Sequence, residues 1–220
     1  MEVRMQKTIK EDKAAVAEQR SNIYALLSAI YREEMTSDLL RQIKDPRFLG
    51  VLSGLGIDLS GDFFQKAEEE VLETMAIEYA RLFIGPGKHI SPHESVHHKK
   101  DNAKWGQLWG DSTVKVKTFI ESSGLEYKPE YKGLPDHISV ELEFMHQVTL
   151  REEQAWKEKD EEGALYCMKI EKKFIEEHLS RWIPDFCEKV VQEAELPFYR
   201  AMAALTKNFI KFEKKERNCV

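Results

Sequence analysis

Apolar residues recur at spacings of three, four and seven positions along most of this chain. One such stripe, within residues 8–34, consists of Val16, Ile23, Leu26, Leu27, Ile30 and Tyr31. This spacing places side chains on one face of an α-helix. No segment has a convincing strand pattern, an internal repeat or a sustained heptad array. The sequence therefore predicts an all-α protein, a single globular domain over residues 1–220 with about eight to twelve helices.

Turn-forming residues divide this pattern into segments. We expect helices over residues 8–34, 37–43, 46–52, 62–83, 103–122, 135–162, 163–182, 185–195 and 197–212. The inward positions of the helix 62–83 are predicted to be Phe63, Phe64, Ala67, Val71, Met75, Tyr79, Leu82 and Phe83. Gly85-Pro86-Gly87 should end that helix, and Pro184 should interrupt another, because proline lacks the N–H that a helix interior needs. Residues 85–102 form the one long irregular segment, and such loops often carry function.

Composition limits the class of protein. Charged residues make up 33% and hydrophobic residues 42% of the chain, and no apolar run is as long as a membrane span. A net charge of −6 argues against a nucleic-acid partner, which selects a basic surface. Residues 1–13 have neither a signal-peptide core nor a twin arginine, so we expect a cytoplasmic protein without stable membrane insertion. Cys167, Cys187 and Cys219 follow no CxxC or zinc spacing and are expected to be reduced thiols.

Histidines are concentrated in the irregular segment. His89, His93 and His97 lie four positions apart, with His98 adjacent, and on a helix this spacing would align imidazoles for zinc. Ser91-Pro92 makes a continuous helix unfavourable here, and the chain has no HExxH motif and no nearby cysteine ligand. We therefore expect no metal and no other cofactor.

Signatures of the common catalytic sites are missing from the sequence. There is no GxSxG motif and no phosphate-binding loop, since Gly85-Pro86-Gly87 lacks a following Lys-Ser or Lys-Thr pair. Glu141 and Glu143 lie two positions apart, so on a helix they point to different faces and make a poor carboxylate pair. We therefore expect that the protein is not an enzyme.

A proline, an acid and a histidine precede the most apolar predicted helix. Pro135 suits a first helical turn. Asp136 can accept backbone N–H groups there and meets the positive end of the helix dipole, and His137 can donate or accept near neutral pH. Two interpretations follow: a helix cap beside a bystander imidazole, or polar anchors at the mouth of a groove.

Aromatic and polar residues flank the irregular segment on both sides. They are Tyr79, Leu82 and Phe83 before it, Pro92 and Ser95 within it, and Trp105, Trp109 and Gly110 after it. Trp105 and Trp109, four positions apart, are expected to share one buried face. With Asp136 and His137, this set could line an apolar cleft that has a few polar anchors, as an amphipathic helix or extended peptide would require.

Four motifs occur in an order that is typical of one family. They are Glu78-Tyr79-Ala80-Arg81-Leu82-Phe83-Ile84-Gly85-Pro86, Ser91-Pro92-His93-Glu94-Ser95-Val96-His97, Trp109-Gly110-Asp111-Ser112-Thr113, and Pro135-Asp136-His137 followed by Glu141-Leu142-Glu143-Phe144-Met145. Together they resemble the TorD/DmsD-type cytoplasmic chaperones, the redox-enzyme maturation proteins of molybdenum oxidoreductases. Residues 178–186 and 194–200 are similar to the closing helices of that family.

This resemblance implies a chaperone that binds the twin-arginine signal peptide of a molybdopterin oxidoreductase precursor of the DMSO or TMAO reductase type. Such a chaperone holds the precursor until its cofactor is inserted and so prevents premature export. The implied signal-peptide site consists of Pro135, Asp136 and His137, shaped by Pro92, Ser95 and Gly110 and walled by Tyr79, Leu82 and Phe83. Where the family has aromatic residues, this chain has His93 and His97, which reduces the stacking surface.

Other interpretations stay open at this point. The chain could attach to a nitrate-reductase-type enzyme and recognise a non-exported subunit. It could be a nucleotide- or metal-dependent enzyme that uses the His-rich loop, or a helical scaffold whose motifs are all packing. Exchange of elements about a hinge after Gly124 would give a domain-swapped dimer in place of a monomer.

Overall fold

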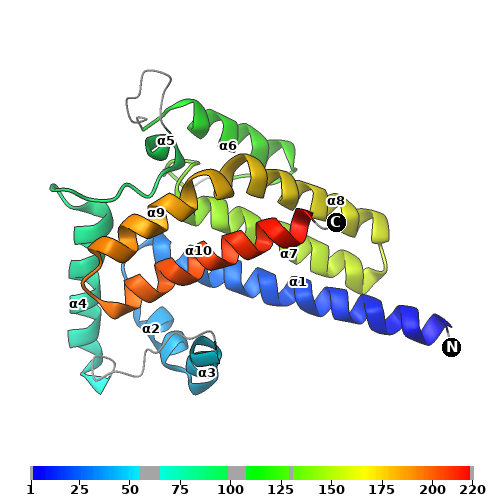
Figure 1. Cartoon of the computed structure of the whole chain (residues 1–220), viewed down its shortest axis with the longest axis horizontal. Helices are drawn as coiled ribbons and strands as arrows, with labels where there is room; N and C mark the ends of the chain where they lie inside the picture. Colours follow the sequence, from blue (N-terminus) through cyan, green and yellow to red (C-terminus); the bar gives the residue numbers. More distant parts are fainter. Residues whose placement is uncertain (1, 55–64, 99–107, 129–130, 219–220) are drawn as a thin grey trace.

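Two long helices, α1 (Glu2–Arg32) and α7 (Ile138–Glu158), lie side by side through the centre of the molecule (Figure 1). The computed structural model describes residues 2–54, 65–98, 108–128 and 131–218. On α7 packs α8 (Glu161–Phe174), and α9 (Ser180–Glu193) packs against α10 (Pro197–Asn218). The other elements are α2 (Ser37–Lys44), α3 (Pro46–Gly54), α4 (Glu68–Tyr79), α5 (Glu94–His97), α6 (Asp111–Ser122) and the π-helical segments η2 (Ala80–Ile84) and η3 (Ile175–Leu179).

The predicted all-α class is confirmed. The described residues contain ten α-helices, two π-helical segments and no strand, and one isolated bridge joins His93 to His137. Within those residues, no helix is both long and apolar enough to cross a membrane.

Several helix ends follow from local side-chain chemistry. The hydroxyl of Thr36 accepts the N–H of Leu39 at 3.2 Å and caps α2, and the Asp160 carboxylate accepts the N–H of Gly163 at 2.9 Å and caps α8. Gly85 ends η2, as predicted, and donates its N–H to a carbonyl one π-turn back. Thr36 and Asp160 therefore fix where α2 and α8 begin, and Gly85 fixes where η2 ends.

Pro184 does not interrupt the helix, and that prediction is wrong. The segments α8, η3 and α9 follow one another without a break, and Pro184 lies inside α9. The wider π-helical turn directly before α9 changes the backbone register where proline would otherwise clash with the preceding turn. Arg181 donates to the carbonyl of Glu176 at 3.0 Å, so a carbonyl of the widened turn is satisfied by a side chain.

Two other predicted helices begin later than expected. The helix predicted from residue 62 begins at Glu68, and Ala67, predicted to point inward, is exposed. Phe63 and Phe64 lie outside the described residues. Three glutamates occupy the first turn of α4, where the positive end of the helix dipole favours acids.

The helix predicted over residues 103–122 begins at Asp111. Trp109 precedes it with a left-handed backbone (φ 63°) and a side chain that is 74% exposed. The expectation that Trp109 shares a buried face is therefore wrong, and Trp105 lies outside the described residues. Val16, predicted within the apolar stripe of α1, is also exposed.

A buried ionic cluster joins α1, α7, α8 and α10. Arg20 contacts Glu152 at 2.6 Å, Glu171 at 2.5 Å and Glu213 at 2.6 Å. Arg217 contacts Glu152 at 3.2 Å and Glu171 at 3.0 Å. Burial raises the pKa of Glu171 to about 8, although Arg20 opposes that shift. The three acids are buried together because guanidinium groups supply both charge and hydrogen bonds.

Candidate functional site

Two of the sequence motifs, Ser91–His97 and the segment that begins at Pro135, are joined by backbone hydrogen bonds. The N–H of Glu94 donates to the carbonyl of Asp136, and the N–H of Ile138 donates to the carbonyl of Pro92, both at 2.9 Å. Between them, His93 and His137 form an isolated antiparallel bridge. The structure therefore brings Pro92 and Ser95 against Asp136 and His137, four of the predicted site residues.

Asp136 caps a helix, but not the one that follows it. Its Oδ2 accepts the N–H of Ser95 at 2.9 Å, at the start of α5. The cap of α7 is His137, whose Nδ1 accepts the N–H of Ser139 at 3.2 Å. The expectation that α7 starts at Pro135 with Asp136 as its cap is therefore wrong, because a partner from a distant segment takes up the Asp136 carboxylate.

Glu94, which sequence reasoning did not select, lies at the centre of this region. It is 2% exposed, and it accepts hydrogen bonds from His178 at 2.9 Å and His98 at 2.8 Å. Burial alone would raise the pKa of Glu94, but these two hydrogen bonds outweigh it and bring the pKa to about 2. Glu94 is therefore a buried carboxylate that stays ionised.

Glu141 was set aside in the sequence and is nevertheless part of the same cluster. It is fully buried, and its Oε2 accepts the indole N–H of Trp182 at 3.0 Å. Burial raises the pKa of Glu141 well above its usual value, and the charge of Glu94 raises it further. The neutral acid is therefore the stable form of Glu141 beside ionised Glu94.

Several buried oxygens in this part of the molecule have no hydrogen-bond partner. They are Asp136 Oδ1, Glu141 Oε1, Ser95 Oγ, Thr113 Oγ1 and Tyr127 OH. Burial and then nearby acids, Glu141 and Asp136 among them, raise the pKa of Tyr127. Tyr127 stacks on Tyr131 with ring centroids 6.0 Å apart. Such unpaired groups are rare in protein interiors. The two carboxyl oxygens can accept from a donor-rich group, and the three hydroxyls can donate or accept.

The predicted apolar wall lies in the core behind this cluster. Tyr79, Leu82 and Phe83 are each 5% exposed or less. Phe83 stacks on Phe186 at 6.0 Å, and Phe186 meets the His97 ring at 5.7 Å. Phe83 is thus connected to α5 through Phe186, and none of the three predicted wall residues is open to solvent. Pro135 and Gly110 are half-buried, and Gly110 precedes the first turn of α6.

Three histidines of the irregular segment, His93, His97 and His98, take part in ring contacts or hydrogen bonds. The rings of His93 and His137 lie 4.9 Å apart, and burial followed by His93 lowers the pKa of His137 to about 3. Burial also lowers the pKa values of His93 and His97. Among the described residues, no group of three or more His, Cys, Asp or Glu side chains could hold a metal.

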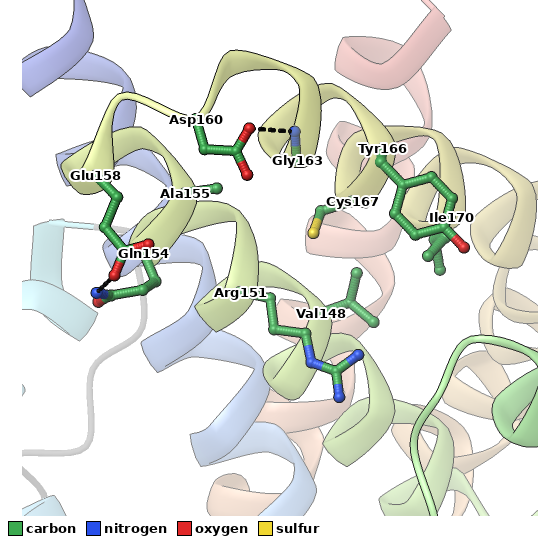
Figure 2. A pocket seen from close by; sticks show the side chains of 10 residues that line it. All are labelled: Val148, Arg151, Gln154, Ala155, Glu158, Asp160, Gly163, Tyr166, Cys167 and Ile170. Carbon is green, nitrogen blue, oxygen red and sulfur yellow. Dashed lines mark hydrogen bonds between the residues drawn. The ribbon is translucent and has the colours of Figure 1, made fainter.

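Two open pockets of about 300 Å³ each lie elsewhere on the surface. Figure 2 shows the first, between α7 and α8, lined by Val148, Arg151, Gln154, Ala155, Glu158, Asp160, Gly163, Tyr166, Cys167 and Ile170. The second adjoins α5 and is lined by His97, Asp185, Glu188, Lys189 and Gln192. The second pocket therefore shares His97 with the helix that Asp136 caps.

Asp136→Ala is expected to lower the free energy of unfolding by about 1–2 kcal/mol, because the N–H of Ser95 loses its acceptor. Asp136→Asn keeps an acceptor oxygen, so it is expected to change the free energy of unfolding by less than about 0.5 kcal/mol. Urea unfolding followed by circular dichroism measures both values. Equal stability of the two variants would contradict a capping role for Asp136.

The nitrate reductase delta subunit family model matches residues 52–188, which is more than half of the chain and includes every predicted site residue. The chain belongs to this family. Several relatives are named chaperone protein TorD. The one from Aliivibrio fischeri is 27% identical to this chain, and the match covers 91% of this chain and 95% of the relative. In Photobacterium profundum the identity is 26% (90% and 94%), and in Vibrio vulnificus 25% (87% and 91%).

A solved structure has the same fold as this member of the nitrate reductase delta subunit family. It is described as a redox enzyme maturation protein from Archaeoglobus fulgidus and has a TM-score of 0.54 at 20% identity, covering 87% of this chain and 93% of that one. The resemblance to TorD-type chaperones is confirmed, and the protein is a TorD-family chaperone of redox enzyme maturation rather than a catalyst.

Proposed function

We propose that this chaperone binds the twin-arginine signal peptide of a molybdopterin oxidoreductase precursor, of the DMSO or TMAO reductase type, in the cytoplasm. It retains the precursor while the cofactor is inserted and so prevents premature export. The TorD names of the relatives support a client of this kind. The chain acts as a monomer or as a dimer swapped after Gly124, a residue with φ +73°.

The observation that carries this proposal is the unpartnered oxygen of Asp136. Asp136 is fully buried, one oxygen caps α5, and the other has no partner. A guanidinium offers five N–H donors in a planar fork that matches a carboxylate. The twin-arginine motif supplies two such groups, and the net charge of −6 favours their approach.

The signal-peptide site is proposed to extend from Asp136 over the residues grouped around it. His137 and Pro135 lie beside it in the chain, and the backbone hydrogen bonds described above place Pro92 and Ser95 against it. Tyr79, Leu82, Phe83 and Gly110 complete the proposed set. Because the first three are buried, access of the apolar part of the leader to them requires the segments packed on them to move on binding.

Calorimetry with a leader peptide of a molybdoenzyme tests this function. Binding of micromolar affinity or tighter, about −8 kcal/mol, is expected for the wild-type protein. Asp136→Asn should weaken it at least about tenfold, because the carboxylate charge is lost while the α5 cap is kept.

The matched control is Asp38→Asn, which removes an acid whose side chain is 86% exposed and should leave the affinity unchanged. A peptide with Lys-Lys in place of Arg-Arg should bind more weakly, since lysine lacks the planar fork. Equal binding of the two peptides, or no loss in Asp136→Asn, would count against the proposed contact.

A second candidate is a chaperone for a nitrate-reductase-type enzyme whose subunit is not exported. The description of the matching family favours it. Affinity capture from cells followed by mass spectrometry separates the two. Recovery of an enzyme without a twin-arginine leader would replace the first candidate by the second.

A further inference from the structure

Three buried acids meet in the site, and in the described part of the chain no lysine or arginine is among their hydrogen-bond donors. Glu94 accepts from two histidines, Asp136 from a backbone N–H, and Glu141 from an indole N–H. The two acids Asp136 and Glu141 each keep one buried oxygen without a partner. Asp136 therefore keeps an unused acceptor oxygen, and Glu141 lies within hydrogen-bonding reach of the Glu94 carboxylate, an interaction that requires a proton on Glu141.

The ionic cluster at the other end of α7 shows what such a set requires. There, Glu152, Glu171 and Glu213 surround the guanidinium of Arg20, which contacts all three. Arg217 forms further ion pairs with Glu152 and Glu171. The set of Glu94, Asp136 and Glu141 has the same number of acids, but no guanidinium donates to it within the part of the chain that the structure describes.

Glu141 is surrounded by groups that oppose its ionisation. Glu94 faces it from α5 and Asp136 from the segment before α7, and both are acids. Tyr127 approaches from the segment after α6, and Trp182 of α9 supplies the single N–H. His98 and His178 face Glu94 and not Glu141 in the hydrogen bonding, so a further buried negative charge on Glu141 would lack a partner of its own. Glu141 therefore holds a proton in the free protein.

We propose that Glu141 is a proton-exchanging contact for one guanidinium group of the leader, an inference that rests on the proposed function. When the guanidinium enters beside Asp136, the O–H bond of Glu141 breaks and the proton passes to the solvent buffer. The electron pair stays on the carboxylate, which then accepts hydrogen bonds from the guanidinium. Each bound peptide thus releases one proton.

The sign of the resulting pH dependence is fixed by this exchange. The free protein carries the proton and the complex does not, so raising the pH favours the complex. The dissociation constant should fall by up to about tenfold per pH unit while Glu141 is protonated in the free protein. His93, His97 and His137, whose pKa values are lowered by burial, are already neutral between about pH 7 and 8.

Calorimetry of the leader peptide in two buffers of different ionisation enthalpy, between about pH 7 and 8, counts the protons released. About one proton is expected for the wild-type protein. Glu141→Gln, which keeps an acceptor for Trp182, should release none and bind with an affinity independent of pH. Glu143→Gln, two residues away on a half-exposed side chain, should behave like the wild type.

The wild-type proton count decides the inference even if Glu141→Gln fails to fold. Peptide binding without net proton release would overturn the role of Glu141 and leave the proposed function intact. Equal release by wild type and Glu141→Gln would assign the proton to another group and overturn it as well. Absence of any binding would overturn the proposed function and this inference together.

Discussion

Replacing Arg20 by Met is expected to lower the free energy of unfolding by about 3–5 kcal/mol. Arg20 contacts three carboxylates that are each 5% exposed or less in their side chains. Methionine fills much of the same space but supplies neither charge nor donors, so the buried acids lose the guanidinium they share, and Arg217 contacts two of them, Glu152 and Glu171. Equilibrium unfolding in urea measures the loss.

The matched control lies twelve residues further along α1. Arg32 also contacts a glutamate of α7, Glu143 at 2.9 Å, but its side chain is 52% exposed. Arg32→Met should therefore cost less than about 1 kcal/mol. If the Arg20 and Arg32 variants lost similar stability, the buried cluster would not hold these helices together as described.

Phe83→Ala is expected to cost about 3–5 kcal/mol of unfolding free energy. The Phe83 ring is 5% exposed and meets Tyr31, Tyr79, Phe186 and Tyr199 at centroid distances of 5.1–6.1 Å. Its removal leaves a cavity at the point where these four aromatic side chains meet. Thermal and urea unfolding measure the effect.

Phe212→Ala in α10 removes the same atoms from a side chain that is 53% exposed and should cost under about 1 kcal/mol. A small loss in Phe83→Ala together with weakened leader binding would instead favour the sequence-based interpretation of Phe83 as an accessible wall of the site. The two outcomes therefore distinguish a core residue from a surface that contacts the client.

Much of the fold could be predicted because burial imposes the helical period. The stripes that contain Leu27 and Met75 correspond to buried faces of α1 and α4. Helix ends that have a local cause, such as the one at Gly85, can also be predicted from the sequence. The position of Pro184 inside α9 could not be predicted, because no residue pattern marks the π-helical turn that precedes it. The end of α7 could not be predicted either, because Lys159 has a left-handed backbone there, where glycine or asparagine is the usual residue.

The site was only partly predictable because its partners are distant in the chain. The motifs placed Asp136 and His137 in one site, but not the α5 N–H that Asp136 accepts, 41 residues away. Glu94 was missed since its partner His178 is 84 residues away. Glu141 did carry a signal: it stands in helical register with Ile138 and Leu142, both fully buried. An acid within an apolar stripe indicates a buried polar partner.

The indole of Trp182 has an optical consequence. It is 1% exposed and donates its N–H directly to Glu141, so a change of charge on that carboxyl group alters the electric field across the ring. Indole emission is sensitive to such fields. Under the proposed proton exchange at Glu141, the emission of Trp182 is expected to differ between the free and the peptide-bound protein, without any added label.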